Sequence, residues 1–258
     1  MSRAFVSSIQ SSVAVVGARG RIPEASSRFA TDLNILDWHD PITWSDADVW
    51  VLGVKPNQFQ DACSPLKDVY ENAQHKPTIV SLMAGVSFAT LETQFPNANI
   101  IKVMANLSIA TSKPVFAVSV NQALEDTPLI DVLKALGDVI VLSEQEMHLA
   151  TVLLGSGPAM FLAIQQQLYD SGKKFGLSHD AALKLSQGAL SGASALSANQ
   201  SMPKDIINQI ASPGGTTEAA LSVIEHSELL GSCEDAVAAA CERSIEISYN
   251  DQNNVNSD

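Results

Sequence analysis

Residues 211–221 read Ala-Ser-Pro-Gly-Gly-Thr-Thr-Glu-Ala-Ala-Leu, and this stretch decides how the whole chain is interpreted. One proline and two glycines favour a tight turn, and an apolar-periodic run of good helix formers follows directly. Such a turn presents backbone N–H groups at the positive end of a helix dipole, where a small carboxylate or phosphate can bind. Thr216 and Thr217 place two hydroxyl groups at the same point. By itself, the pattern is also that of an N-capped surface helix.

Short apolar runs recur through the first half of the chain. Several are continuous and rich in valine and isoleucine, as strands covered on both faces are. These runs predict strands at Val13–Gly17, Val49–Val54, Thr78–Met83, Ile100–Met104, Val115–Val120 and Val139–Leu142. Helical spacing between them predicts helices at Phe59–Ala73, Phe88–Phe95 and Pro128–Leu136. The alternation of strands and helices predicts an α/β layered sheet.

Beyond residue 142 the strand-like runs end and helical patterns take over. They predict helices at Ser143–Phe175, His179–Ala198, Pro203–Ala211, Thr217–Glu225 and Glu234–Ser248. The sequence Gly-Ser-Gly-Pro at 155–158 is expected to bend or break the first of these, because Pro158 has no N–H to donate. We therefore expect an α/β domain over residues 1–142, an all-α domain over 143–250 and a polar, frayed tail over 251–258.

Composition limits the partners and the compartment of the protein. The 258 residues are 46% hydrophobic and 17% charged, which suits two domains with a sizeable core. The net charge of −13 argues against binding to nucleic acid or to an anionic membrane surface. No run reaches 18 apolar residues, so no membrane span is predicted. Three widely spaced cysteines indicate reduced thiols in a cytoplasmic protein, and five histidines without ligand spacing indicate no metal site.

Two motifs in the C-terminal half carry a resemblance to a known family. Gly-Ser-Gly-Pro at 155–158 lies in an apolar stretch, and Ser-Pro-Gly-Gly-Thr-Thr follows at 212–217. Together they resemble pyrroline-5-carboxylate reductase, and the resemblance extends through 173–177, 181–189 and 234–243 and back to 46–56 and 81–85. It implies a Rossmann-like N-terminal nucleotide-binding domain and a helical C-terminal dimerisation domain. The implied protein is a homodimer or higher homo-oligomer that reduces 1-pyrroline-5-carboxylate to L-proline in proline biosynthesis.

The N-terminus departs from this expected fold. A dinucleotide-binding domain normally opens with a strand, a G-x-G-x-x-G turn and a helix, and the sequence contains no such turn. Because little more than one helix fits between Gly17 and Trp50, Val13–Gly17 is interpreted as the second strand and Met1–Gln10 as the remnant of the first helix. We expect that the chain begins late and lacks its first strand, which would weaken cofactor binding and stability. The first 23 residues also have the composition of a transit peptide, although the apolar run favours a strand.

Two arginines indicate which nicotinamide cofactor the domain would bind. Arg19 and Arg21 follow the predicted second strand, where dinucleotide-binding folds meet the adenosine ribose. Arginine at this place suits a 2′-phosphate through bidentate hydrogen bonds, which favours NADPH, with NADH as the alternative. A solvated basic loop would contain the same two residues. The resemblance adds further cofactor-binding residues, namely Asp40, Val54, Lys55, Met83, Ala84, Asn106 and Gln209.

Some of these positions differ from the family pattern. Asp40 stands where the family often has a ribose-contacting asparagine, and Met83 is bulkier than the usual small residue. Ala84 and Gly85 are small enough to let a dinucleotide approach. Residues 104–108, Met-Ala-Asn-Leu-Ser, correspond to Met-Pro-Asn-Thr-Pro in the family. This loop therefore loses rigidity and a hydroxyl near the nicotinamide.

The resemblance places Glu144, Gly215, Thr216 and Thr217 at the substrate. Thr217 aligns with a threonine whose hydroxyl faces the imine nitrogen and is the implied catalytic residue. The N–H groups of Gly215 and Thr216 would hold the substrate carboxylate. Glu144 matches a glutamate near the substrate, but Ser143-x-x-Glu146 is a capping box, and a glutamate in a first helical turn is favoured in any case.

Two other functions stay open. A homo-oligomeric relative that binds a proline-like ligand without catalysis is favoured by the missing glycine-rich turn and by the altered loop at 104–108. A reductase of another cyclic imine would use the same scaffold. Lys55, Glu144 and the complete Ser-Pro-Gly-Gly-Thr-Thr favour the reductase.

Overall fold

The computed structural model describes residues 17–18, 36–37, 44, 47–105, 114–122, 128–198 and 202–255. The chain forms two compact units, which we call the sheet unit and the helical unit. The sheet unit comprises Met1–Gly155 and Ala240–Asp258, and the helical unit comprises Ser156–Ala239. The last strand ends at Val141, next to the predicted change from strands to helices at residue 142. The boundary between the two units lies later in the chain, after Gly155. The predicted domains at 1–142 and 143–250 stay a prediction.

The sheet unit contains a five-stranded sheet with the order β3-β4-β5-β6-β7. Its strands are β3 (Val49–Leu52), β4 (Thr78–Ser81), β5 (Ile100–Met104), β6 (Val115–Val120) and β7 (Asp138–Val141). All neighbours are parallel except β5 and β6, which pair antiparallel with Lys102 opposite Ser119. The predicted α/β sheet is confirmed, and the predicted strands β5 and β6 have the observed bounds.

A second, two-stranded sheet lies earlier in the chain. β1 (Gly17–Ala18) pairs parallel with β2 (Leu36–Asp37). The sequence predicts β1 near its observed place but predicts no strand between Gly17 and Trp50, so β2 corrects that expectation. A two-residue strand is too short to produce an alternating or continuous apolar run, which is why the pattern missed it.

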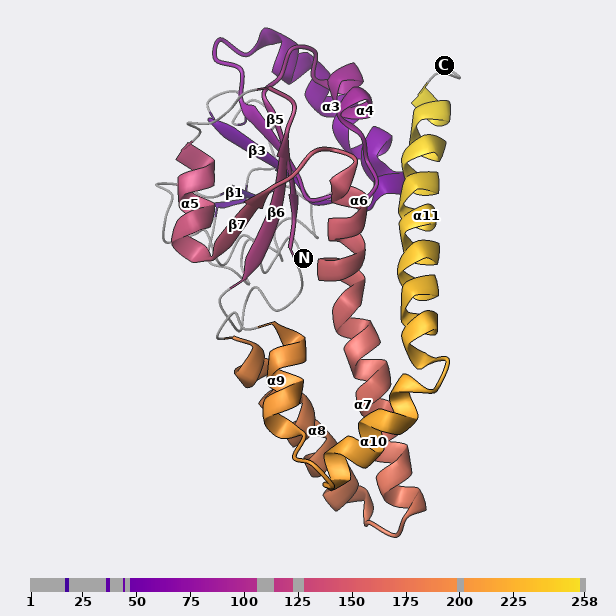
Figure 1. The fold of residues 1–258 in the computed structure, drawn as a ribbon. Helices are drawn as coiled ribbons and strands as arrows, with labels where there is room; N and C mark the ends of the chain where they lie inside the picture. Colours follow the sequence, from indigo (N-terminus) through magenta and orange to yellow (C-terminus); the bar gives the residue numbers. More distant parts are fainter. Residues whose placement is uncertain are drawn as a thin grey trace. The chain divides into compact units, whose positions relative to one another are not determined.

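Helices cover both faces of the five-stranded sheet (Figure 1). The short 3₁₀ helix η2 (Pro56–Gln58) leads into α3 (Phe59–Asn72), which lies with α4 (Phe88–Gln94) over one face. The helix α5 (Pro128–Leu136) covers the other face. A sheet buried on both faces requires apolar side chains at successive positions, which explains the continuous valine and isoleucine runs.

An aromatic cluster fills the core beneath α3 and α4. Trp50 is 1% exposed, and its ring meets those of Trp44, Tyr70 and Phe95 edge to face at centroid distances of 5.7, 6.1 and 6.1 Å. Its indole N–H donates to the Trp44 carbonyl at 3.0 Å. Edge-to-face contact is the preferred geometry of aromatic pairs. This cluster fixes α3 and α4 on β3 and β4.

The second half of the chain is helical, as predicted. The helix α6 (Glu146–Ala150) continues through a π-helical stretch, η4 (Thr151–Ser156), into α7 (Gly157–Lys174). The π-helical stretch lies where Gly-Ser-Gly-Pro was expected to bend the helix, and Pro158 stands in the first turn of α7, directly after that stretch. The remaining helices are α8 (His179–Ser197), α9 (Pro203–Ile210), α10 (Thr216–Glu225) and α11 (Leu229–Val255).

Large apolar side chains are exposed along the helical unit. Phe161 is 66% exposed, Leu168 52%, Leu185 62% and Val223 70%. The continuous helical stretch Glu146–Lys174 is long and apolar enough to cross a membrane by length and composition, with a mean hydropathy of 1.6 over an 18-residue window. The sequence analysis missed this property because it considered only unbroken runs of apolar residues. Helices that meet another protein chain satisfy the same two criteria, so the stretch alone does not identify a membrane span.

Candidate active site

The carboxyl ends of β3 and β4 bring four of the predicted cofactor residues to one edge of the sheet. Because these strands are parallel neighbours, their carboxyl ends lie side by side. Val54 and Lys55 follow β3, and Lys55 is exposed. Met83 and Ala84 follow β4, and the Met83 side chain is only 4% exposed and packs in the core. The backbone N–H of Met83 donates to Ser81 Oγ at 3.3 Å.

A small pocket opens beyond the ends of β4 and β5. Its walls include Ser81, Gly85, Lys102, His148 and Thr151. The cavity volume is about 10 Å³, which is room for about one water molecule. Two of these wall residues, Lys102 and His148, carry a titratable nitrogen, and they lie among apolar side chains.

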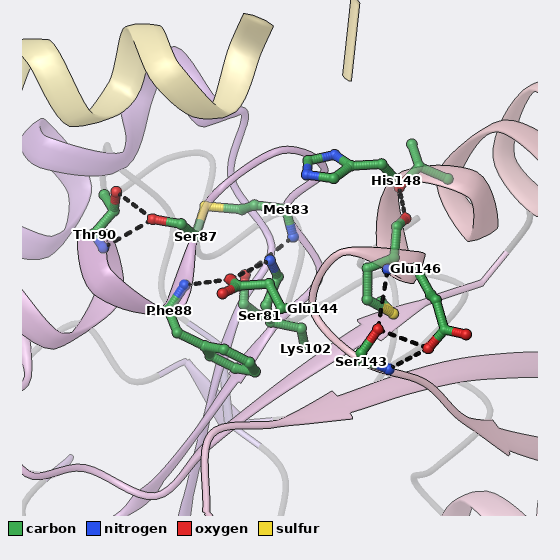
Figure 2. Close-up of polar contacts among 12 residues, drawn as sticks. Ser81, Met83, Ser87, Phe88, Thr90, Lys102, Ser143, Glu144, Glu146 and His148 are labelled. Atoms are coloured by element: carbon green, nitrogen blue, oxygen red, sulfur yellow. Dashed lines mark hydrogen bonds and ion pairs between the residues drawn. The ribbon is translucent and has the colours of Figure 1, made fainter. Parts of the chain in front are cut away.

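Glu144 and Lys102 form an ion pair at this pocket (Figure 2). Lys102 lies in β5, all of whose residues are buried, and its side chain is 7% exposed. Its ammonium donates to Glu144 Oε1 at 3.0 Å. The N–H of Phe88, at the start of α4, donates to the same oxygen at 2.7 Å. The carboxylate of Glu144 therefore joins β5, α4 and the segment before α6.

The capping box before α6 uses a different glutamate. The Ser143 N–H and hydroxyl both donate to Glu146 Oε2, at 2.8 and 2.7 Å, and the Glu146 N–H donates to Ser143 Oγ at 3.3 Å. These hydrogen bonds lower the pKa of Glu146. Because Glu146 satisfies the cap, Glu144 is left to contact Lys102. The capping interpretation of this sequence thus explains Glu146 and does not account for Glu144.

The ion pair and burial set the charge states around the pocket. Burial lowers the pKa of the Lys102 ammonium, and the Glu144 carboxylate opposes that shift. Burial also lowers the pKa of His148, the positive charge of Lys102 lowers it further, and Glu144 acts in the opposite direction. His148 Nδ1 lies 3.0 Å from Ser244 Oγ of α11. The last helix therefore contacts the pocket residue His148 through a hydrogen bond.

A second contact with α11 explains the glycine that follows Ala84. Gly85 has a φ of +79°, which favours glycine. A Cβ atom at this position would lie 2.7 Å from Cγ2 of Ile247. The sequence suggests that Gly85 is small so that a dinucleotide can approach. In the structure, Ile247 of the same chain occupies the adjacent space.

The turn at 212–217 lies in the helical unit and has the expected tight geometry. Gly214 has a φ of +72°, and a Cβ on Gly215 would lie 2.7 Å from Ser212 Oγ. The Gly215 N–H, predicted to bind a carboxylate, donates to the Ser212 carbonyl at 3.0 Å. The N–H groups of Thr216 and Thr217 belong to the first turn of α10 and have no partner within that helix. They are the donors that the turn offers.

A carboxylate already occupies part of this turn. Glu218 Oε2 accepts a hydrogen bond from the Gly214 N–H at 2.8 Å. Thr217 is half-buried and Thr216 is exposed, as is Gln209 on α9. The turn therefore has one N–H group that binds a carboxylate of the same chain, two N–H groups without a partner within α10, and a half-buried threonine hydroxyl.

Four predicted cofactor residues, Arg19, Arg21, Asp40 and Asn106, lie outside the described residues. Lys102, His148 and Ser244 are site residues that sequence reasoning missed. A lysine inside the apolar run 100–104 is a signal that could have identified Lys102, because an ammonium is buried only with a partner. Ser244 carries no such signal, since it is 96 residues from His148. Across the described part of the chain, no group of three or more His, Cys, Asp or Glu residues could hold a metal ion.

The lowered pKa of His148 predicts a dependence of stability on pH. The unfolded histidine titrates near about 6.5, so below that pH the unfolded chain binds more protons than the folded one. The free energy of unfolding should therefore fall as the pH drops from about 6.5, by less than about 1.4 kcal/mol per pH unit because the imidazole is partly exposed. Melting temperatures at pH 7.5 and 5.5 measure this loss. His148→Gln should reduce it and the exposed control His75→Gln should not; equal losses in all three proteins would contradict the assignment.

Comparison with known proteins shows which enzymes the chain resembles. The family model for pyrroline-5-carboxylate reductase dimerisation matches residues 144–247. The pyrroline-5-carboxylate reductase of Staphylococcus aureus strain COL is 28% identical over 231 residues, which cover 87% of this chain and 84% of that protein. The match therefore includes both the sheet and the helices.

Solved structures show the same fold. A pyrroline-5-carboxylate reductase from Coxiella burnetii is 26% identical, with a TM-score of 0.82 over 96% of this chain and 94% of that chain. The Plasmodium falciparum pyrroline carboxylate reductase with NADP bound is 20% identical, with a TM-score of 0.75 over 95% of this chain and 93% of that chain. These matches show that the chain is similar to pyrroline-5-carboxylate reductases along most of its length.

Proposed function

We propose that this protein reduces 1-pyrroline-5-carboxylate to L-proline with NADPH or NADH. The observation that carries the proposal is the turn at 212–217, where the carboxylate of Glu218 accepts a hydrogen bond from the Gly214 N–H. The turn thus has the chemistry to bind a small carboxylic acid, and the reductases that the chain resembles act on such an acid.

The residues of the turn have distinct roles in the proposed reaction. The N–H groups of Thr216 and Thr217 bind the substrate carboxylate, since the positive end of the α10 dipole favours an anion there. The Thr217 hydroxyl holds the imine nitrogen. Gly215 contributes its lack of a side chain, because a Cβ would collide with Ser212. The protein supplies orientation and proximity, which a protonated imine needs more than acid–base groups.

A reduced nicotinamide, when bound, supplies the hydride. The described residues at the edge of β3 and β4 fit such a group, because Lys55 provides an exposed positive charge in a chain of net charge −13 and Ala84 is small. Val54, Lys55, Met83 and Ala84 would border it. Arg19, Arg21, Asp40, Asn106 and Gln209 remain proposed cofactor residues, and the two arginines favour NADPH.

The protein is also proposed to act as a cytoplasmic homo-oligomer. The matched dimerisation model supports homo-oligomerisation. Exposed apolar side chains on α7, α8 and α10, including Phe161, Leu185 and Val223, would be buried by a second copy. Burial between two copies would also explain the apolar composition of Glu146–Lys174 without a membrane.

Oxidation of NADPH and NADH by the purified chain tests the function. Turnover with 1-pyrroline-5-carboxylate is expected, and Thr217→Ala should lower kcat about tenfold to a hundredfold, the loss of one hydrogen bond to a charged group. The matched control Ser222→Ala removes an exposed hydroxyl from the same helix and should leave kcat unchanged. A rate in Thr217→Ala equal to that of the parent would remove Thr217 from the mechanism.

The same assay separates the two alternatives. The sequence has no G-x-G-x-x-G turn, which favours a relative that binds L-proline without turnover. Calorimetric binding of L-proline by a protein that oxidises no NADPH would establish that relative. Faster turnover with a six-membered cyclic imine would instead indicate a reductase of another substrate.

A further inference from the structure

We propose that Lys102 is a positioning residue, which holds the carboxylate of Glu144 in place for the substrate. The proposal rests on the proposed function and on the resemblance to pyrroline-5-carboxylate reductase, which implies that Glu144 contacts the substrate. Lys102 itself would not touch the substrate. It would act only through the carboxylate that its ammonium contacts.

Burial gives the first argument. Lys102 lies at the centre of β5, opposite Ser81 of β4 and Ser119 of β6, and its side chain is 7% exposed. An ammonium in such a place destabilises the fold unless a carboxylate or several acceptors compensate. Among the described residues, its ion partner is Glu144, at 3.0 Å, and the Phe88 ring lies 5.3 Å from the ammonium. An apolar side chain would fill this position without the cost of desolvating an ammonium. We therefore infer that the lysine has a role beyond packing.

The geometry of the carboxylate gives the second argument. Both described hydrogen bonds to Glu144 end on Oε1, one from Lys102 and one from the Phe88 N–H. Two donors on one oxygen fix the orientation of the carboxyl group, and the second oxygen accepts no hydrogen bond from the described residues. The Glu144 side chain is 31% exposed, so a ligand can reach it. Lys102 therefore orients a carboxylate that remains accessible.

The third argument concerns the neighbouring charges. The described titratable groups that act on one another here are Lys102 of β5, Glu144 before α6 and His148 of α6. The repulsion from Lys102 lowers the pKa of His148 and so disfavours a second cation beside the carboxylate. Ser244 of α11 contributes a neutral hydroxyl. Lys102 is thus the positive charge that fixes Glu144.

Kinetics of three variants test the proposal. Lys102→Met keeps the length of the side chain and removes the charge, Lys102→Arg restores a charge, and Glu144→Gln removes the carboxylate. We expect Lys102→Met to raise KM for the imino acid about tenfold, with KM for NADPH unchanged and Lys102→Arg recovering most of the loss. Lys134→Met, which breaks the exposed pair with Asp131, is the matched control and should behave as the parent.

The double variant separates positioning from packing. If Lys102 acts through Glu144, Lys102→Met in the Glu144→Gln background should cause less than a twofold further change. Effects that multiply, or an equal rise in both KM values, would overturn the proposal and leave the proposed function standing. If the parent protein reduces no 1-pyrroline-5-carboxylate, the proposed function fails; L-proline affinity is then compared in the same variants, and unchanged affinity in Lys102→Met overturns the positioning role as well.

Discussion

Replacing Trp50 with alanine should lower the free energy of unfolding by about 3–5 kcal/mol. The indole is 1% exposed and touches three other aromatic rings edge to face, so its removal leaves a large cavity between β3, α3 and α4. The variant also loses the hydrogen bond to the Trp44 carbonyl. Because typical domains are stable by only about 5–15 kcal/mol, much of this margin would disappear. Urea unfolding followed by circular dichroism measures the loss.

Two further variants calibrate that result. Val49→Ala shortens a 38% exposed side chain in the same strand and should cost less than about 1 kcal/mol. Trp50→Phe keeps a ring in the cluster and should fall between the two. A Trp50→Ala protein that unfolds at the same urea concentration as Val49→Ala would show that the aromatic cluster does not hold the sheet unit together.

Replacing Gly85 with alanine should destabilise the protein by about 2–5 kcal/mol. The backbone φ of +79° costs a residue with a side chain about 1–2 kcal/mol. The new Cβ would also lie 2.7 Å from Cγ2 and 3.1 Å from Cβ of Ile247, and overpacking of this kind costs about 1–3 kcal/mol. Because Gly85 lines the pocket with Lys102 and His148, the displacement of α11 should lower activity together with stability.

The two parts of this cost can be separated by a second substitution. Gly85→Ala combined with Ile247→Ala removes the 2.7 Å contact with Cγ2 and leaves the looser 3.1 Å contact with Cβ and the backbone strain, so the two changes should together cost less than the sum of the single changes. Gly188→Ala in α8 is the control, since no atom lies within 4 Å of its added Cβ. That variant should gain about 0.5–1 kcal/mol, as alanine does over glycine inside a helix. Additive losses for Gly85 and Ile247 would show that α11 does not pack on Gly85.

The elements with strong periodicity were predictable from the sequence. The continuous apolar runs identified five strands of the main sheet, because a sheet covered on both faces leaves few positions for polar side chains. The spacing of apolar residues identified α5 with its observed bounds and α3, α4, α8 and α9 to within a residue at either end. The strand β2 is too short to produce a pattern, and a two-residue pairing depends on its partner β1 rather than on its own sequence.

The sequence predicts the parts of the candidate site that depend on neighbouring residues. It does not predict the parts that depend on tertiary contacts. Gly214 and Gly215 are needed for the turn itself, so the sequence identifies them. The use of the Gly215 N–H inside the turn depends on the position of the Ser212 carbonyl, which no sequence pattern specifies. The Lys102–Glu144 pair joins residues 42 positions apart. Only folding brings these two residues together. The capping-box pattern also offered a structural explanation for a glutamate in this segment, so the contact of Glu144 with Lys102 was not predicted.

The central claim is that the turn at 212–217 binds the carboxylate of a small cyclic amino acid. Backbone amide chemical shifts recorded while L-proline is added to the full chain test it most directly. We expect saturable shifts of the Thr216 and Thr217 amides that follow one dissociation constant, and a change at Gly214 as the Glu218 carboxylate is displaced or repelled. Saturating L-proline that shifts amides elsewhere, with those of Gly214, Thr216 and Thr217 unmoved, would contradict the account.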